Sequence, residues 1–158
     1  MNFRAEPKWD HWTRDEARRY QARTLVRFLK EQVLPFSPFY REHLKDVDLD
    51  AIRSVDDMRL LPFTTKSDIV PSDENPEGPR NFVLQPTPEA IKAAWPLGKK
   101  LPLLAKKLRR GADAVRADLV SEYTPVKMLF TTGRSAASLP FFLSLYDLEI
   151  LKTTGKRI

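Results

Sequence analysis

The 158-residue chain is 42% hydrophobic and 30% charged, a composition that suits one globular domain with a buried core. It contains no cysteine, only two histidines and no apolar run of about 18 residues, which excludes disulfides, thiolate metal sites and membrane-spanning helices. Its formal charge of +6 favours anionic partners, although a merely soluble basic protein is the commoner case, and the lack of an apolar signal core predicts a cytoplasmic protein.

The first helix is predicted to begin at a capping box. Thr13 and Glu16 have the spacing at which a hydroxyl and a carboxylate each accept a backbone N–H at a helix start. Pro35 is expected to end this helix, because the residue before a proline is biased away from helical geometry. The helix between them has one apolar face, formed by Ala22, Leu25, Val26, Leu29 and Val33.

Short helices punctuated by proline are predicted to follow. Ser37 and Pro38 suit the N-cap and the first position of a second helix. The pairs Ser54–Asp57 and Thr65–Asp68 predict two more helix starts, because each places an acceptor where the first backbone N–H groups of a helix need one.

A loop is predicted to separate these helices from two further helical segments. Residues 71–87 have the composition of a loop, which Phe82 and its apolar neighbours anchor. A helix is expected to begin at Pro88 and to stop at Trp95. A longer helical segment follows from about 102 to 122, with Gly111 as its expected break.

The segment from residue 99 to 110 is both basic and rich in leucine. Amphipathic helices of this kind lie on anionic membranes or grip phosphates. The alternative is a helix with its leucines in the core and its lysines in water, and it is favoured because the same apolar face continues to Leu119. That face comprises Leu101, Leu104, Leu108, Val115 and Leu119, and the cations are Lys99, Lys100, Lys106, Lys107, Arg109 and Arg110.

After this segment, the pattern changes from helix to strand. Apolar residues alternate from Val126 to Phe130, and a second strand is expected before a helix that begins near Tyr146. Residues 131–138, between the strands, are small or hydroxylated around Gly133, so that backbone amides and hydroxyls are free to approach an anion. The alternative is an ordinary hairpin loop.

The predicted fold class is α/β, mainly helical over residues 13–124 with a small β element near 126–145. The last helix carries an apolar stripe and no C-cap, which leads us to expect that the chain is the N-terminal portion of a larger domain. This stripe comprises Leu148, Leu151, Gly155 and Ile158.

Three motifs occur in an order that resembles a known family. Phe39-Tyr40-Arg41 follows the first helix, and the sequence LPFTTK runs from Leu61 to Lys66, with Asp68 just beyond it. The small-residue turn from Thr131 to Ser135 then stands in the place of a Ser/Thr/Gly-rich phosphate loop. Together they resemble the opening of phenylacetate–CoA ligase-like enzymes, members of the adenylate-forming (AMP-binding, acyl-CoA synthetase) ligase superfamily.

The resemblance implies an enzyme that joins a carboxylic acid to a thiol in two steps. The acid attacks ATP, with Mg²⁺, to give an acyl adenylate, and coenzyme A then takes the acyl group. The resemblance implies no catalytic residue and no metal ligand within this chain, which is therefore expected to be inactive alone. The implied phosphate-binding residues are Thr131, Thr132, Gly133, Arg134 and Ser135, with Arg134 supplying the positive charge.

The expected partners follow from the same resemblance. They are the remainder of the ligase polypeptide or a homodimer partner, together with a carboxylic acid substrate, and no nucleic acid is expected. ATP or AMP, Mg²⁺ and coenzyme A are the implied cofactors, none of which is expected to bind this chain tightly. The alternative function is a basic interaction module that binds an anionic surface or a partner chain without catalysis.

Overall fold

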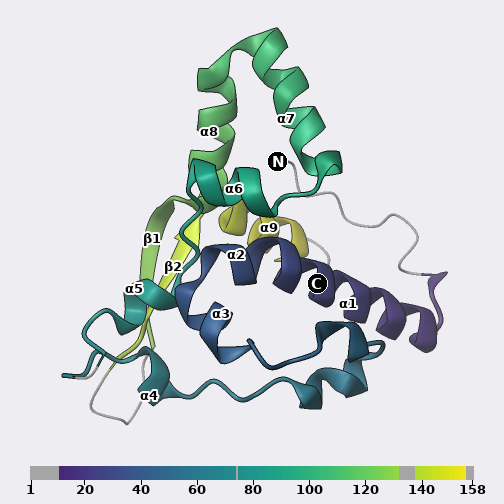
Figure 1. Ribbon diagram of the computed structural model, residues 1–158, viewed down its shortest axis with the longest axis vertical. Helices are drawn as coiled ribbons and strands as arrows, with labels where there is room; N and C mark the ends of the chain where they lie inside the picture. The colour runs from purple at the N-terminus through teal and green to yellow at the C-terminus, as the bar shows by residue number, and fades with distance from the viewer. Residues whose placement is uncertain (1–10, 74, 132–137, 156–158) are drawn as a thin grey trace. The chain divides into compact units, whose positions relative to one another are not determined.

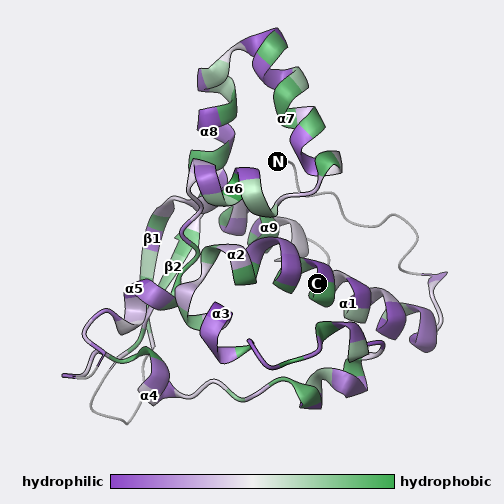
Figure 2. Ribbon diagram, viewed as in Figure 1, coloured by the Kyte–Doolittle hydropathy of each residue, from purple (hydrophilic) through white to green (hydrophobic). Residues whose placement is uncertain are grey.

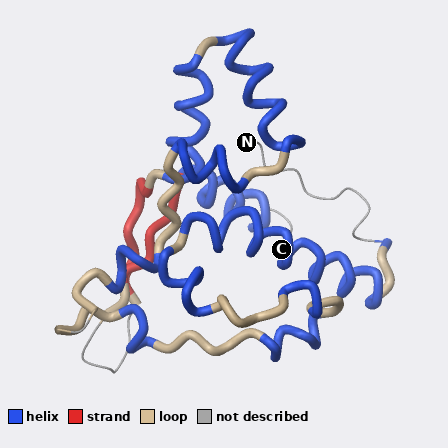
Figure 3. Tube along the Cα trace, in the orientation of Figure 1, coloured by secondary structure: helices blue, strands red, loops and turns tan. Residues whose placement is uncertain are grey.

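The computed structural model describes residues 11–73, 75–131 and 138–155. Within these ranges the chain is mainly helical and has one two-stranded antiparallel sheet, as Figure 3 shows. The predicted combination of many helices with a small β element is confirmed at this level. The chain divides into two compact units, the first of which ends at Ala94 while the second begins at Trp95.

The first unit is built mainly from short helices, several of which begin at side-chain caps. The predicted capping box at Thr13 is confirmed, and the helix starts predicted at Ser54 and Thr65 are confirmed and also carry capping boxes. Ser37 caps the helix that begins at Pro38. The elements, most of them labelled in Figure 1, are α1 (Arg14–Phe28), the π-helical turn η2 (Leu29–Val33), α2 (Leu34–Phe36), α3 (Pro38–His43), the 3-10 helices η3 (Leu49–Ala51) and η4 (Val55–Leu60), α4 (Lys66–Ile69), α5 (Gly78–Phe82) and α6 (Pro88–Ala94).

The prediction that Pro35 ends the first helix is wrong. α1 passes into η2, and α2 continues through Pro35 to Phe36 before Ser37 leaves helical geometry. In the π-helical turn the Leu34 N–H donates to the carbonyl of Leu29, five residues back. Proline lacks an N–H and crowds the carbonyl four residues before it, so a wider turn accommodates the ring without ending the helix.

The core of the first unit lies along the apolar face predicted for its first helix. Ala22 of α1 is buried, and Leu25 and Val26 of α1 pack against a cluster of buried apolar side chains. Removing such side chains from water is the main stabilising term, about 1.5–3 kcal/mol for each one that is fully buried. The buried cluster consists of Leu29, Val33, Leu44, Leu49 and Ile52.

A short helix, α5, interrupts the segment predicted to be a loop. Gly78-Pro79 reads as a turn by composition, but proline also suits the first turn of a helix, which is the role it has here. The prediction is therefore wrong for residues 78–82. The expected anchoring by Phe82 is confirmed, because its ring lies 5.3 Å from the ring of Phe39 and 5.1 Å from that of Tyr40.

The second unit contains a helical hairpin followed by a β-hairpin and a last helix. Gly111 separates the first two helices at a φ of 83°, as its predicted role as a break requires. The first of these helices starts earlier than predicted and takes Pro102 inside it. The elements are α7 (Leu97–Arg110), α8 (Ala112–Tyr123), β1 (Pro125–Phe130), β2 (Pro140–Ser144) and α9 (Leu145–Gly155).

The leucines of α7 do not lie in the core, and that prediction is wrong. Gly111 turns the chain back on itself, so the apolar face of α7 does not continue into α8 as the sequence pattern had indicated. Figure 2 shows apolar and polar residues alternating along α7. We use the name leucine stripe for Leu97, Leu101, Leu104 and Leu108, which are 72%, 60%, 54% and 88% exposed.

None of the described helices combines the length and the apolarity needed to cross a bilayer.

Candidate functional site

The predicted phosphate loop connects β1 to β2, which pair side by side in antiparallel fashion (Figure 1). Phe130 lies opposite Pro140 in the last pair of the ladder. Thr131 comes next, and its N–H donates to the carbonyl of Leu139 at 3.0 Å while its Oγ1 accepts the Leu139 N–H at 3.0 Å. These two hydrogen bonds hold the ends of the loop together at its base.

Thr131 is the one predicted phosphate-binding residue that the structure describes. It is half-buried, and its hydroxyl oxygen is engaged by a backbone N–H. A hydroxyl that accepts one hydrogen bond still has a proton to donate, so Thr131 both closes the loop and retains a donor for an anion. The other predicted residues, Thr132, Gly133, Arg134 and Ser135, lie outside the described residues.

The β-hairpin exposes apolar side chains on both of its faces. Every residue of β1 is exposed. On one face Met128 lies opposite Phe142, and on the other Leu129 lies opposite Phe141. Apolar residues on both faces are typical of strands that are covered on both sides, whereas a two-stranded hairpin alone in water is only marginally stable. Within the described residues, the hairpin therefore leaves apolar surface exposed on both of its faces.

A capping box that the sequence reasoning missed joins β2 to α9. The N–H and Oγ of Ser144 donate to Asp147 Oδ2 at 2.8 and 2.9 Å, and the Asp147 N–H donates to Ser144 Oγ at 3.2 Å. Ser144 is buried, so these bonds fix the direction in which α9 leaves the sheet. The Ser-x-x-Asp spacing before an apolar run was the signal that identifies such a cap.

A half-buried carboxyl group lies near the end of α8. Burial raises the pKa of Glu122, and a hydrogen bond with Tyr123 acts in the opposite direction. Burial also raises the pKa of the Tyr146 hydroxyl, and the negative charges of Glu122 and Asp147 raise this pKa further. Glu122 therefore keeps its proton to a higher pH than a surface glutamate does. No sequence motif distinguishes it from the other acidic residues.

The two N-terminal motifs belong to the first unit, and in it they have structural roles. Arg41 donates from Nε to the carbonyl of Leu34 at 3.2 Å and from Nη2 to that of Pro35 at 2.9 Å, which satisfies carbonyls that α2 leaves unpaired at its end. In LPFTTK, the Thr65 N–H donates to Asp68 Oδ2 at 2.6 Å. Phe63 of the same motif is 93% exposed.

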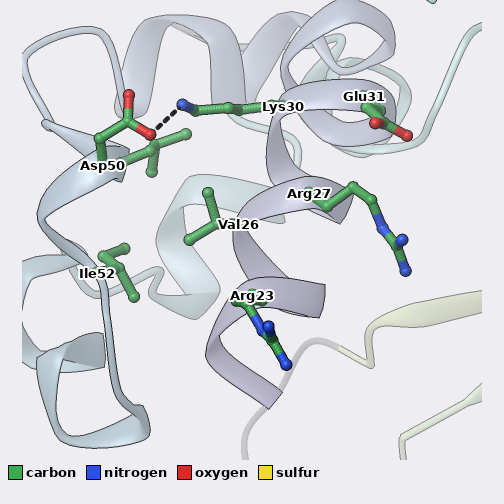
Figure 4. A pocket seen from close by; sticks show the side chains of 8 residues that line it. Arg23, Val26, Arg27, Lys30, Glu31, Asp50 and Ile52 are labelled. Atoms are coloured by element: carbon green, nitrogen blue, oxygen red, sulfur yellow. Dashed lines mark hydrogen bonds and ion pairs between the residues drawn. The ribbon is translucent and has the colours of Figure 1, made fainter. Parts of the chain in front are cut away.

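A basic hollow of about 390 Å³ lies beside α1 in the first unit. Figure 4 shows its apolar side formed by Val26 and Ile52, with Lys30 paired to Asp50 at 2.6 Å. Arg23 and Arg27 extend from α1 on the same side as each other, and neither makes an ion pair with another described residue. The sequence reasoning did not single out this hollow, because its two sides come from segments far apart in the chain.

Across residues 11–73, 75–131 and 138–155, no group of three or more His, Cys, Asp or Glu side chains is arranged to hold a metal ion, so no described residue is assigned to Mg²⁺. No protein-family model, curated protein or solved structure matches the chain. Its function is therefore inferred from its motifs and from the chemistry of its own residues.

Proposed function

We propose that the chain is the N-terminal portion of an ATP-dependent carboxylate–CoA ligase of the adenylate-forming superfamily. The observation that carries this proposal is the ordered set of three motifs at Phe39–Arg41, Leu61–Lys66 and Thr131–Ser135. In this proposal, Thr131, Thr132, Gly133, Arg134 and Ser135 bind the phosphates of ATP. The remainder of the ligase polypeptide supplies the residues for adenine, Mg²⁺ and coenzyme A.

The β-hairpin supports this proposal in two ways. The third motif falls between two paired strands whose ends Thr131 ties together, so the loop is anchored on a regular element. The strands also carry apolar residues on both faces, which suits a hairpin inside the large sheet of an α/β ligase domain. Hydroxyls, backbone amides and a guanidinium are the groups that recognise phosphate oxygens in proteins.

The proposed reaction makes three demands on the whole enzyme. Donors surround the polyphosphate, a metal ion neutralises its charge, and the acid is held in line with the α-phosphorus. A carboxylate oxygen forms a bond to that phosphorus as the bond to pyrophosphate breaks, which gives the acyl adenylate. The thiol of coenzyme A then loses its proton and displaces AMP to form the thioester. Of these three demands, only the binding of the polyphosphate is assigned to this chain.

The test begins with the coding DNA read past codon 158 and uses the polypeptide that it encodes. Calorimetric titration with Mg-ATP is expected to show binding that weakens by at least about tenfold in Arg134→Ala, because a charge-assisted hydrogen bond contributes about 1.5–3 kcal/mol. The 158-residue chain alone is expected to bind Mg-ATP weakly or undetectably.

Arg53→Ala is the matched control, because it removes one exposed cation from the first unit and should leave ATP affinity unchanged. A reading frame that stops at codon 158, or an affinity that is the same in Arg134→Ala as in the wild type, contradicts the proposal.

A second candidate function is a basic interaction module without catalysis. The observation that favours it is the exposed leucine stripe of α7, which has cations on its flanks. The two functions are compatible, because the first relies on the β1–β2 loop and the second on α7.

A further inference from the structure

The leucine stripe faces away from the rest of the helical hairpin. Leu97, Leu101, Leu104 and Leu108 are spaced at four, three and four residues, which aligns them along one side of α7. Lys106 lies on the opposite side and pairs with Asp118 of α8, and Leu103 is partly buried on that side too. α8 therefore does not cover the stripe. Scattered exposed leucines are normal, but a continuous apolar stripe indicates a surface that binds something.

The cations of α7 account for the net positive charge of the chain. α7 contains six cations and no carboxylate. Removing these six from the 27 Lys and Arg of the chain leaves 21, which equals its 21 Asp and Glu. The net charge of +6 therefore equals the charge of α7, and the rest of the chain has equal numbers of positive and negative side chains.

Most of these cations are available to an external anion. Lys106 is paired with Asp118, and Lys99 lies over the Trp95 ring at 5.4 Å. Lys100, Lys107, Arg109 and Arg110 make no hydrogen bond or ion pair with any residue that the structure describes. By helical geometry Lys100 and Lys107 flank one edge of the leucine stripe and Arg109 flanks the other. The stripe is thus bordered on both sides by positive charge.

We propose that α7 docks on an anionic lipid bilayer, with the leucine stripe in the boundary between headgroups and acyl chains and with its cations against lipid phosphates. The helix has 14 residues and is about 21 Å long at 1.5 Å per residue, so it lies in the plane of the interface. The methylene stems of lysine and arginine extend along apolar surface while their charged ends reach the headgroups. An anionic bilayer thus offers an apolar boundary to the leucines and phosphate groups to the cations.

A second copy of the chain and a nucleic acid each satisfy only one of these two features. Pairing the stripes of two copies would bring two sets of cations together, with no carboxylate on either α7 to neutralise them. A nucleic acid would neutralise the cations but would leave the leucines in water, since its binding is dominated by phosphate contacts. Charge complementarity combined with the apolar stripe therefore selects the lipid surface.

Vesicle flotation with the full 158-residue chain tests this proposal. We expect the chain to float with vesicles that mix phosphatidylcholine and phosphatidylglycerol, and not with vesicles of phosphatidylcholine alone. Binding should weaken as the salt concentration rises from about 0.1 M to about 1 M, because the screening length falls from about 10 Å to about 3 Å.

Two variants separate the leucines from the cations. Leu101→Gln/Leu104→Gln/Leu108→Gln is expected to lower partitioning about a hundredfold, at about fivefold for each half-buried leucine that is lost. Lys100→Gln/Lys107→Gln is expected to lower it roughly twenty-five-fold, at about fivefold for each cation near an anionic surface. The substituted side chains are exposed or make no described bond, and circular dichroism should show that the helices are retained.

Arg14→Gln/Arg19→Gln is the matched control, because it removes two exposed cations from α1 and should bind vesicles as the wild type does. The proposal is overturned if this control loses as much binding as the α7 charge variant, or if the leucine variant still floats with anionic vesicles. It is also overturned if light scattering shows a dimer that the leucine variant abolishes, or if an oligonucleotide binds α7 with no dependence on the leucines.

Discussion

Ser37 shows how one small side chain joins separate segments of the first unit. It is fully buried, and its Oγ accepts the Tyr40 N–H at 3.3 Å at the start of α3. The same hydroxyl lies 3.2 Å from the carbonyl oxygens of Asn81 and Phe82, to which it donates its proton. Ser37 therefore caps one helix and holds the end of another against it.

Replacing Ser37 by alanine should cost more than the loss of an ordinary helix cap. We expect Ser37→Ala to lower the free energy of unfolding by about 1–3 kcal/mol, since it also leaves two partly buried carbonyl groups without their donor. Ser54→Ala is the control, because Ser54 is a partly exposed cap and its loss should cost about 1 kcal/mol. Urea unfolding measures both values, and equal losses would argue against the joining role of Ser37.

Glu122 should make the stability of the protein depend on pH. Because burial raises its folded-state pKa, the folded protein keeps this proton after the unfolded chain has released it. Its contribution to stability is therefore greatest at acid pH and is lost as the pH rises from the ordinary value near 4.5 through the folded-state pKa.

The variant Glu122→Gln should remove this dependence. It is expected to raise the melting temperature at neutral pH and to flatten the stability profile in the window above pH 4.5. Thermal melts over a pH series measure the effect. Glu149→Gln is a matched change at an exposed glutamate of α9 and should leave that part of the profile unchanged. A variant that melts at a lower temperature at neutral pH would contradict the assignment.

At the scale of the elements, Gly111 determines that α7 and α8 form a hairpin rather than one helix. Its φ of 83° is unfavourable for any residue with a Cβ, although no atom lies within 4 Å of where that Cβ would be. Gly111→Ala is therefore expected to destabilise the hairpin by about 1–2 kcal/mol through backbone strain alone. Gly98→Ala, inside α7 and equally unobstructed, should instead stabilise it by up to about 1 kcal/mol. Thermal unfolding of the two variants should shift in opposite directions.

Helix starts were predictable from the sequence, whereas the ends of helices and the burial of their faces were not. A cap is a local contact, so Thr13 with Glu16 and Thr65 with Asp68 specify it without knowledge of the fold. The consequence of Pro35 depends on whether a π-helical turn absorbs it, and the exposure of Leu108 depends on the direction of the chain after Gly111. Both depend on tertiary arrangement, which helical periodicity does not encode.

The same limit applies to the candidate site. The two strands and the helix after them were predictable from alternation and from small-residue composition, and they are present as β1, β2 and α9. The role of Thr131 in closing the loop required the strand register, which places Leu139 opposite it. The raised pKa of Glu122 required the partial burial of its carboxyl group near the end of α8, which no local pattern indicates.

At the scale of the whole molecule, two apolar surfaces are exposed among the described residues. One is the apolar β-hairpin, which the proposed function assigns to the larger sheet of a ligase domain. The other is the leucine stripe of α7, a helix whose six cations account for the net charge of the chain.

The most direct test of the proposed function is carboxylate-dependent exchange of labelled pyrophosphate into ATP, measured on the polypeptide encoded by the whole reading frame. This exchange reports acyl adenylate formation without any need for coenzyme A. We predict exchange that requires an aromatic or aliphatic acid and that falls by at least about tenfold in Arg134→Ala, because that variant loses a charge-assisted contact with the phosphates. Exchange that no acid supports, or that is as fast in Arg134→Ala as in the wild type, would contradict the account.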